Sequence, residues 1–247
     1  MSHGFQFDFN YTYSKSIDIT STATRVGYNG GLYGSALPNA FSPRQFRGVS
    51  DFDTAHQINA NWIAGLPFGR GRRFGHDSSG FVDALIGGWQ VTGLVRWTSG
   101  FPFSVDNGQS WPTDWNYQGL AELSTKPKVG VFKQPDGSVN MFGDPVTVLA
   151  VRQNDVYHPF PGQSGSRNIL RGPGFAGWDM GLDKRWKLPW AEGHTLQFRW
   201  EVYNVLNQTR FNVQSNAPSL TQTQSFGDYT GLLTQPRVMQ FALRYDF

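Results

Sequence analysis

One stretch of the sequence gathers the side chain types that proteins use to bind sugars. Residues 106–117 run Asp-Asn-Gly-Gln-Ser-Trp-Pro-Thr-Asp-Trp-Asn-Tyr. Aromatic rings can stack on a sugar face while carboxylates accept hydrogen bonds from its hydroxyl groups. The candidate ligand-binding residues are Asp106, Trp111, Asp114, Trp115 and Tyr117. The alternative is that the rings tether their own loop or lie at a lipid interface.

No other pattern in the sequence points to chemistry on a substrate. The five His have no ligand spacing and there is no Cys, so we expect no metal site and no cofactor. Residues 162–165 (Gly-Gln-Ser-Gly) lack the second Gly position of a nucleophile elbow. We therefore expect no catalytic residue and no enzyme activity. The net charge of +3 is spread along the chain, which gives no nucleic-acid patch.

The end of the chain alternates between apolar and polar residues. Side chains alternate across a strand with period 2, so residues 237–247 predict a strand with one apolar and one polar face. The apolar face would carry Met239, Phe241, Leu243, Tyr245 and Phe247, and the polar face Gln240, Arg244 and Asp246. A tilted strand of about 9–11 residues spans a bilayer.

Five upstream segments show the same alternation. The six predicted strands lie near residues 4–18, 54–67, 84–98, 174–187, 193–205 and 237–247. There is no run of 18 apolar residues, which excludes a transmembrane helix. Charged residues make up 16% of the chain, where soluble proteins carry about 25%. The fold class that we predict is all-β, an antiparallel transmembrane outer-membrane β-barrel segment of about six to eight strands.

The polar faces of these strands carry charges at mid-strand, which suits a water-filled or plugged lumen. These residues are Arg96, Asp179, Asp183, Arg199, Glu201, Arg244 and Asp246. A soluble sheet with one face in solvent would show them as well.

The lengths of the connections favour a barrel more strongly. They are roughly 35, 16, 75, 5 and 31 residues, and outer-membrane barrels alternate long external loops with short periplasmic turns. Asp136-Gly137 predicts a hairpin inside the longest loop. The turn 188–192 predicts a tight hairpin with Trp190 at the membrane interface. The basic turn 68–74 is interpreted as solvated charge, with contact to lipid headgroups as the alternative.

Several motifs, in order, resemble the carboxy-terminal end of TonB-dependent outer-membrane receptors, especially the Oar-type group with a carboxypeptidase-regulatory-like domain. Residues 88–93 (Gly-Trp-Gln-Val-Thr-Gly) and 98–103 (Thr-Ser-Gly-Phe-Pro-Phe) resemble a strand followed by that group's SGxPF loop entry. Residues 166–184 contain an "RN…RGPG…D" pattern, and residues 197–207 resemble its "FRxExxNxxN" penultimate strand.

The resemblance implies roles for two sets of residues. The terminal strand would be an assembly signal for the barrel-assembly machinery, carried by Phe241, Leu243, Tyr245 and Phe247. The internal motifs imply structural roles for Arg167, Arg171, Arg199, Glu201, Asn204 and Asn207.

The sequence departs from such a receptor in what it lacks. There is no plug domain, no TonB-contacting segment and no signal peptide, and six strands cannot close a 22-stranded barrel. We therefore expect residues 1–247 to be the carboxy-terminal barrel part of a receptor that takes up a scarce nutrient, a glycan or a metal chelate. The expected partners are outer-membrane lipid and lipopolysaccharide, the assembly machinery, and the TonB complex only through the missing plug region.

Two alternatives remain open at this point. One is a small self-contained outer-membrane barrel, a porin or an adhesin, with two more strands near residues 145–151 and 226–233. The other is a secreted all-β carbohydrate-binding module.

Overall fold

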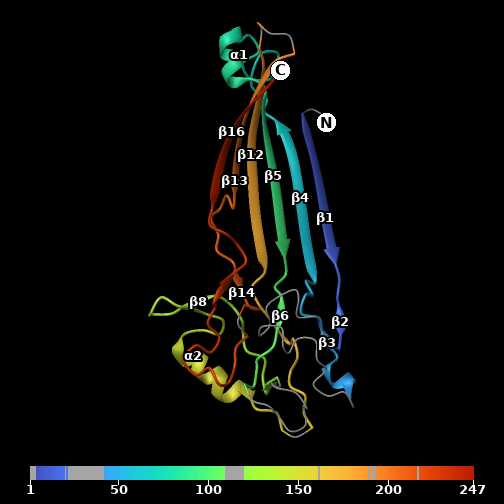
Figure 1. The fold of residues 1–247 in the computed structure, drawn as a ribbon, viewed down its shortest axis with the longest axis vertical. Coiled ribbons are helices and arrows are strands. Elements are labelled where there is room, and N and C mark those ends of the chain that lie inside the picture. Colours follow the sequence, from blue (N-terminus) through green and yellow to red (C-terminus); the bar gives the residue numbers. More distant parts are fainter. Residues whose placement is uncertain are drawn as a thin grey trace.

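The computed structural model describes residues 4–19, 21, 42–108, 120–160, 162–188, 190, 193–215 and 217–247. Within them, six long strands form one antiparallel sheet, in which they lie side by side in chain order (Figure 1). They are β1 (Phe5–Tyr13), β4 (His56–Gly65), β5 (Trp89–Thr98), β12 (Phe175–Lys187), β13 (Thr195–Tyr203) and β16 (Val238–Asp246). The all-β antiparallel prediction is confirmed, and each predicted segment contains one of these strands.

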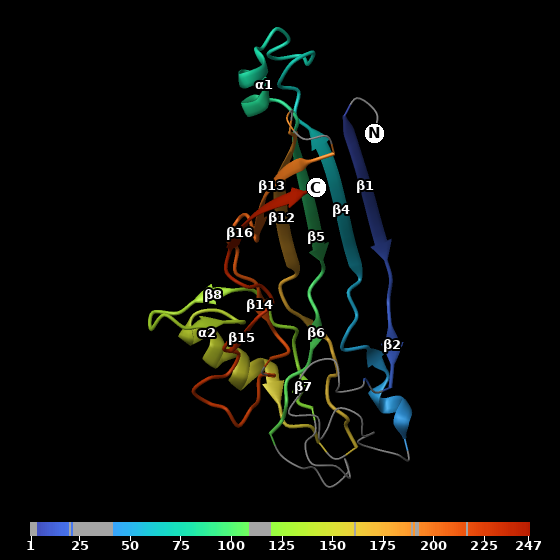
Figure 2. The same ribbon diagram turned by 45° about the horizontal axis from the view of Figure 1, so that its top comes forward.

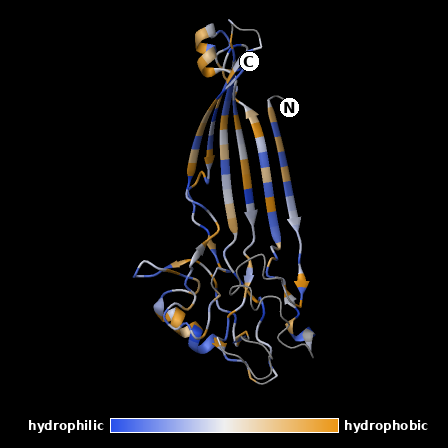
Figure 3. Ribbon diagram, in the orientation of Figure 1, coloured by the Kyte–Doolittle hydropathy of each residue, from blue (hydrophilic) through white to orange (hydrophobic). Residues whose placement is uncertain are grey.

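The register places like residues together on each face of the sheet. Trp200 pairs with Phe241 and Phe198 with Leu243, and the rings of Trp200 and Phe241 stack with centroids 5.9 Å apart. Hydrophobic and hydrophilic residues alternate along the strands (Figure 3). The apolar face remains open to its surroundings, since Phe7 is 67% exposed and Phe241 66% exposed. A soluble sheet would cover such a face with another layer.

The connections separate the molecule into two ends. Residues 66–88 and 188–194 connect strands at one end, called here the short-turn end, where both termini and helix α1 (Gly80–Ile86) also lie (Figures 1 and 2). Residues 14–55, 99–174 and 204–237 connect strands at the opposite end, called the loop end. The predicted alternation of long and short connections is confirmed.

The loop end contains short elements that pair among themselves. The pairs are β2 (Ile17–Asp18) with β3 (Gly48–Val49), β6 (Pro102–Phe103) with β11 (Leu170–Arg171), β7 (Glu122–Leu123) with β10 (Val156–Tyr157), β8 (Phe132–Lys133) with β9 (Val139–Asn140), and β14 (Phe211–Asn212) with β15 (Gly231–Leu232). The helices are the 3₁₀ turn η2 (Pro43–Phe46), α2 (Pro145–Ala150) and the π-helical turn η3 (Val151–Asp155).

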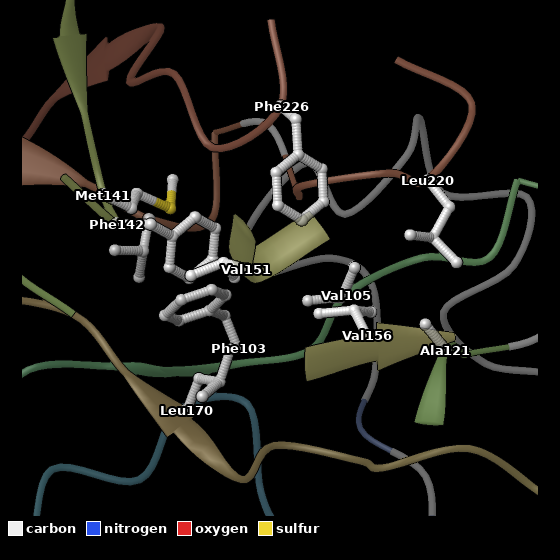
Figure 4. Close-up of a cluster of buried hydrophobic side chains, with 11 residues drawn as sticks. Phe103, Val105, Ala121, Met141, Phe142, Val151, Val156, Leu170, Leu220 and Phe226 are labelled. Carbon is white, nitrogen blue, oxygen red and sulfur yellow. The ribbon is translucent and has the colours of Figure 1, made fainter. Parts of the chain in front are cut away.

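The main hydrophobic core of the described residues lies at the loop end and not in the sheet (Figure 4). Phe103 and Leu170 are fully buried, and the rings of Phe142 and Phe226 stack with centroids 5.4 Å apart. The cluster consists of Phe103, Val105, Ala121, Met141, Phe142, Val151, Val156, Leu170, Val213, Leu220 and Phe226. The second and third long connections therefore fold together as one packed unit.

Two predictions about hairpins are confirmed. Gly137 has φ +90° and donates its N–H to the carbonyl of Gln134, which closes the turn between β8 and β9. At the short-turn end β12 and β13 pair from Lys187 and Thr195 onward. Trp190 in the turn between them is 78% exposed, and its position at the membrane interface stays a prediction.

The predicted strand at 84–98 begins too early. Residues 80–86 form α1, because Ser79 caps its first turn by accepting a hydrogen bond from the Val82 N–H. The predicted strand at 4–18 is also interrupted after Tyr13, and Ile17–Asp18 leave the sheet to pair with β3. In the described part of the chain, no helix is long and apolar enough to cross a membrane.

The two additional strands considered near 145–151 and 226–233 are wrong. Residues 145–150 form α2, because Asp144 accepts a hydrogen bond from the Thr147 N–H at 2.8 Å and Pro145 occupies the first turn. In the second segment the strand β15 has two residues, and it pairs with β14 outside the main sheet.

The apolar face contains one tight contact between aromatic ring and backbone, which yields a test of the fold. Trp62 lies directly opposite Gly93, and a Cβ at residue 93 would overlap its ring. We expect Gly93→Val to lower the free energy of unfolding in detergent by about 1–3 kcal/mol, because the ring has to move. Gly80→Ala, where a Cβ would meet open space, is the control, measured by urea titration. An unchanged stability of the Gly93 variant would contradict this packing.

Candidate functional site

The polar face of the sheet carries charges of both signs within reach of each other. Arg96 Nη2 lies 3.8 Å from Asp179 Oδ2, and Arg199 lies 4.0 Å from Asp183 and 3.7 Å from Glu201. Both arginine side chains are 53% exposed. Solvated pairs of this kind contribute about 0–1 kcal/mol each. These pairs therefore add little stability. They make the polar face of the sheet a hydrated surface, called here the polar wall.

A hollow lies along this wall and is lined mainly by polar side chains. The lining residues that carry hydrogen-bonding groups are Gln90, Thr92, Asp183, Arg185, Gln197, Arg199 and Glu201. Gln197 Nε2 donates to Asp183, and Gln240 Nε2 donates to Glu201 Oε2 at 3.0 Å. Donors and acceptors alternate across the four strands β5, β12, β13 and β16, so the surface offers polar solutes many weak hydrogen bonds.

At the loop end, Arg167 joins the first and second long connections. Its guanidinium lies 2.7 Å from Asp18 and 3.6 Å from Asp51, and it donates to the Phe46 carbonyl at 2.9 Å and to Ser21 Oγ at 3.0 Å. The Arg167 side chain is 11% exposed. Charge-assisted bonds in such a sheltered place are stronger than neutral ones. Arg167 thus fixes the position of the first long connection.

Arg171 makes a second connection nearer the sheet. Its Nη2 bonds to the carboxylate of Asp53, and its Nη1 donates to the carbonyls of Asp53 and Gly100 at 3.1 and 3.0 Å. The Asp53 side chain is 1% exposed, and its other oxygen accepts the Ser16 N–H at 2.6 Å. Arg171 therefore compensates a buried carboxylate that would be costly alone.

Sequence reasoning missed Asn168 and Gln214, which complete this network. Asn168 has φ +53° and donates from Nδ2 to the Val49 carbonyl and to Asp51, both at 2.7 Å. Gln214, 1% exposed, donates to the carbonyls of Asp51 and Pro102. The sequence contained a signal for Asn168, because it follows Arg167 in the Arg-Asn motif and Asn tolerates the left-handed backbone conformation. We call Arg167, Asn168, Arg171 and Gln214 with their three aspartates (Asp18, Asp51 and Asp53) the loop clamp.

Asn204 and Asn207 shape the exit from β13. Both have positive φ, 53° and 49°. The Asn204 N–H donates to Asp179 at 2.8 Å, and its Nδ2 donates to the carbonyls of Gln208 and Gln235. Asn207 Oδ1 accepts the Arg237 N–H at 3.1 Å. The two residues turn the chain and join it to the start of β16.

The predicted assembly signal lies on the open apolar face of an edge strand. Phe241, Leu243 and Tyr245 are 66%, 68% and 52% exposed, and Phe247 is 93% exposed. Tyr245 contacts His194 through its hydroxyl group, and the two rings lie 5.6 Å apart. Recognition of this strand by an assembly machinery stays a prediction.

Four of the five predicted sugar-binding residues, Trp111, Asp114, Trp115 and Tyr117, lie outside the described residues. Asp106 is 8% exposed, and its carboxylate accepts the Gly108 N–H at 2.6 Å. Its backbone N–H and carbonyl bond to residues 218 and 220. Among the residues that the structure describes, no group of three or more His, Asp or Glu could hold a metal ion.

The loop clamp predicts an acid-sensitive loop end. Burial acts to raise the pKa of Asp18, but hydrogen bonds from Ser21 and Arg167 outweigh it and hold the pKa below its ordinary value. The stabilisation is therefore complete above the unfolded pKa of about 3.9 and is lost as the pH falls through the lower folded value. We expect limited proteolysis at residues 14–55 to accelerate below about pH 4. Asp18→Asn should cleave faster at neutral pH and lose this pH dependence; an unchanged profile would contradict the role of Asp18.

Removing Arg167 tests the clamp directly. We expect Arg167→Met to destabilise the loop end by roughly 2–3 kcal/mol, less than for a fully buried pair because its partners keep about a fifth to a quarter of their exposure. Hydrogen exchange of residues 42–55 measures this. Arg47→Met, an exposed arginine in the same connection, is the control. Equal exchange in the two variants would show that Arg167 does not hold this connection.

Comparison with known proteins agrees with the geometry of the sheet. A family model described as "Outer membrane beta barrel domain" matches residues 1–240. No curated protein and no solved structure matches the chain. The matched segment includes five of the six long strands in full and the beginning of β16. The chain therefore belongs to the outer membrane beta barrel domain family, and its sheet lies in the outer membrane.

Proposed function

We propose that this chain is the carboxy-terminal barrel portion of a TonB-dependent receptor that takes up a scarce nutrient. The observation that carries the proposal is the pair of open edges. In the described part of the chain, β1 pairs only with β4 and β16 only with β13. Unpaired backbone groups are not tolerated in hydrocarbon, so both edges require further strands. A wide barrel that contains these six strands meets that requirement.

The remaining features support transport better than chemistry. The polar wall would line the lumen, where solvated charges are tolerated. The packed loop end would form part of the external surface that meets the nutrient, a glycan or a metal chelate. The prediction that residues 106–117 bind a sugar is part of this proposal. No catalytic step is part of the proposal, and nucleic acid is not among the proposed partners.

The proposed partners follow from the same arrangement. The apolar face would contact outer-membrane lipid and lipopolysaccharide. The terminal strand, with Phe241, Leu243, Tyr245 and Phe247, would be recognised by the barrel-assembly machinery. Contact with the TonB complex would pass through a plug region outside residues 1–247, so these residues alone would not transport.

The alternatives are less well supported. A self-contained eight-stranded barrel needs two more long strands, and the segments considered for them form helix α2 and the two-residue strand β15. A secreted carbohydrate-binding module would have to cover or solvate the open apolar face.

The proposal predicts a longer gene product. We expect the reading frame upstream of Met1 to continue into a plug domain and a TonB-contacting segment, as measured by sequencing the locus and its transcript. The whole product should capture the periplasmic domain of TonB on a column, and residues 1–247 should not, because the plug makes that contact. A stop codon and a genuine start site that bound the frame at Met1 would refute the receptor function for this product.

A further inference from the structure

Helix α1 is attached to the apolar face of the sheet at the short-turn end. Trp89 Nε1 donates to the Leu85 carbonyl at 2.8 Å, and Trp186 Nε1 donates to the Ala84 carbonyl at 2.7 Å. Trp89 and Trp186 extend from neighbouring strands, and their rings contact edge to face at 6.2 Å. The last carbonyls of a helix have no partner within the helix. Two indole groups therefore hold the end of α1 in place.

A buried cation completes this attachment. Lys184 has the apolar-face position of β12 between Leu182 and Trp186, yet it is 2% exposed. Its Nζ lies 3.5 Å from the Asp83 carbonyl and 5.3 and 5.2 Å from the Trp89 and Trp186 ring centroids. A cation is favourable at a helix carboxy terminus and over aromatic rings. This end of α1 is thus fixed by three side chains of the sheet.

The exposed side of α1 is apolar. Phe81, Val82, Leu85 and Ile86 are 76%, 41%, 57% and 38% exposed. Their spacing of one, four and five residues places them on one side of a helix. Helix α1, which carries this stripe, lies beyond the strand ends at the short-turn end (Figures 1 and 2).

The turn before α1 adds positive charge beside the apolar stripe. Arg70, Arg72 and Arg73 are exposed, and the Arg73 guanidinium lies 5.6 Å from the Phe74 ring centroid. Of the two nearby acids, Asp83 is half-buried and accepts the Arg70 N–H. Asp77 pairs with His76 at 2.9 Å. The solvent side of this turn is therefore mainly basic.

We propose that residues 67–88 form an interfacial membrane anchor that binds anionic phospholipid headgroups at the periplasmic leaflet. Short turns of outer-membrane barrels face the periplasm, which places α1 at that leaflet. An apolar stripe beside arginines is the arrangement of helices that lie in a membrane interface. The arginines match the charge of anionic phospholipids. The inference depends on the position of the sheet in the outer membrane and not on transport.

A fluorophore on α1 tests the position of the helix. Residues 1–247 contain no Cys, so Leu85→Cys, made in the whole gene product with any Cys outside these residues replaced by Ser, gives one labelling site. In vesicles of phosphatidylethanolamine and phosphatidylglycerol, we expect spin-labelled lipid to quench this fluorophore and aqueous iodide not to. Leu149→Cys, 48% exposed on α2 at the loop end, is the matched control and should respond only to iodide. A fluorophore on Phe9→Cys, on the apolar face of β1, reports whether the sheet has inserted into the bilayer. Only preparations in which spin-labelled lipid quenches this fluorophore are used for the comparison.

The arginines are tested with the same label. We expect spin-labelled phosphatidylglycerol to quench the Leu85→Cys fluorophore more than spin-labelled phosphatidylcholine does. Replacing Arg70, Arg72 and Arg73 with Gln should abolish this preference, because each arginine is expected to raise the affinity for anionic lipid roughly fivefold. Arg44→Gln with Arg47→Gln at the loop end is the control. Equal quenching by the two lipids would overturn the headgroup preference. If iodide but not spin-labelled lipid quenches the fluorophore at residue 85 in inserted protein, the proposal that residues 67–88 form a membrane anchor is wrong.

Discussion

The structure depends on one constraint, which is that a strand in hydrocarbon must pair its backbone groups and present apolar side chains outward. The sheet meets it by a register that gathers apolar residues on one face, such as Trp200 beside Phe241. Water would penalise that face, but lipid does not. Consequently the sheet needs no covering layer, and most of its aromatic residues stay exposed without being a defect of the fold.

The same constraint moves the hydrophobic core elsewhere. Outside the hydrocarbon the long connections are in water and must exclude it themselves, which explains the cluster around Phe103 and Leu170. The three long connections meet at the loop end, and apolar packing alone would leave their relative positions loosely defined. The loop clamp supplies directional bonds, with Arg167 and Arg171 binding carboxylates on the first connection. The loop end thus has a hydrophobic cluster and a set of directional bonds of its own.

Period-2 patterns predicted the six long strands because alternation is a local property of the chain. The same patterns missed α1 and α2, where capping by Ser79 and by Asp144 with Pro145 decides the structure. The sequence motifs pointed to Arg167 and Arg171, but not to their partners. Arg167 and Asp18 are 149 residues apart in the chain, and no local pattern connects them. Sugar binding by residues 106–117 stays a prediction: of its five residues only Asp106 is described, and its carboxylate accepts the Gly108 N–H of its own turn.

Lys184 illustrates how a break in a pattern can carry information. It follows Trp178, Met180 and Leu182 at the spacing of the apolar face, where a free ammonium group facing lipid would be costly. The structure resolves this conflict by placing the carbonyl end of α1 over the ammonium group, between two indole rings. The helix has seven residues and no buried side chain, so it depends on the Ser79 cap and on its contacts with Lys184, Trp89 and Trp186. The lysine therefore helps to hold α1 at the end of the sheet, and α1 makes the lysine tolerable on the apolar face.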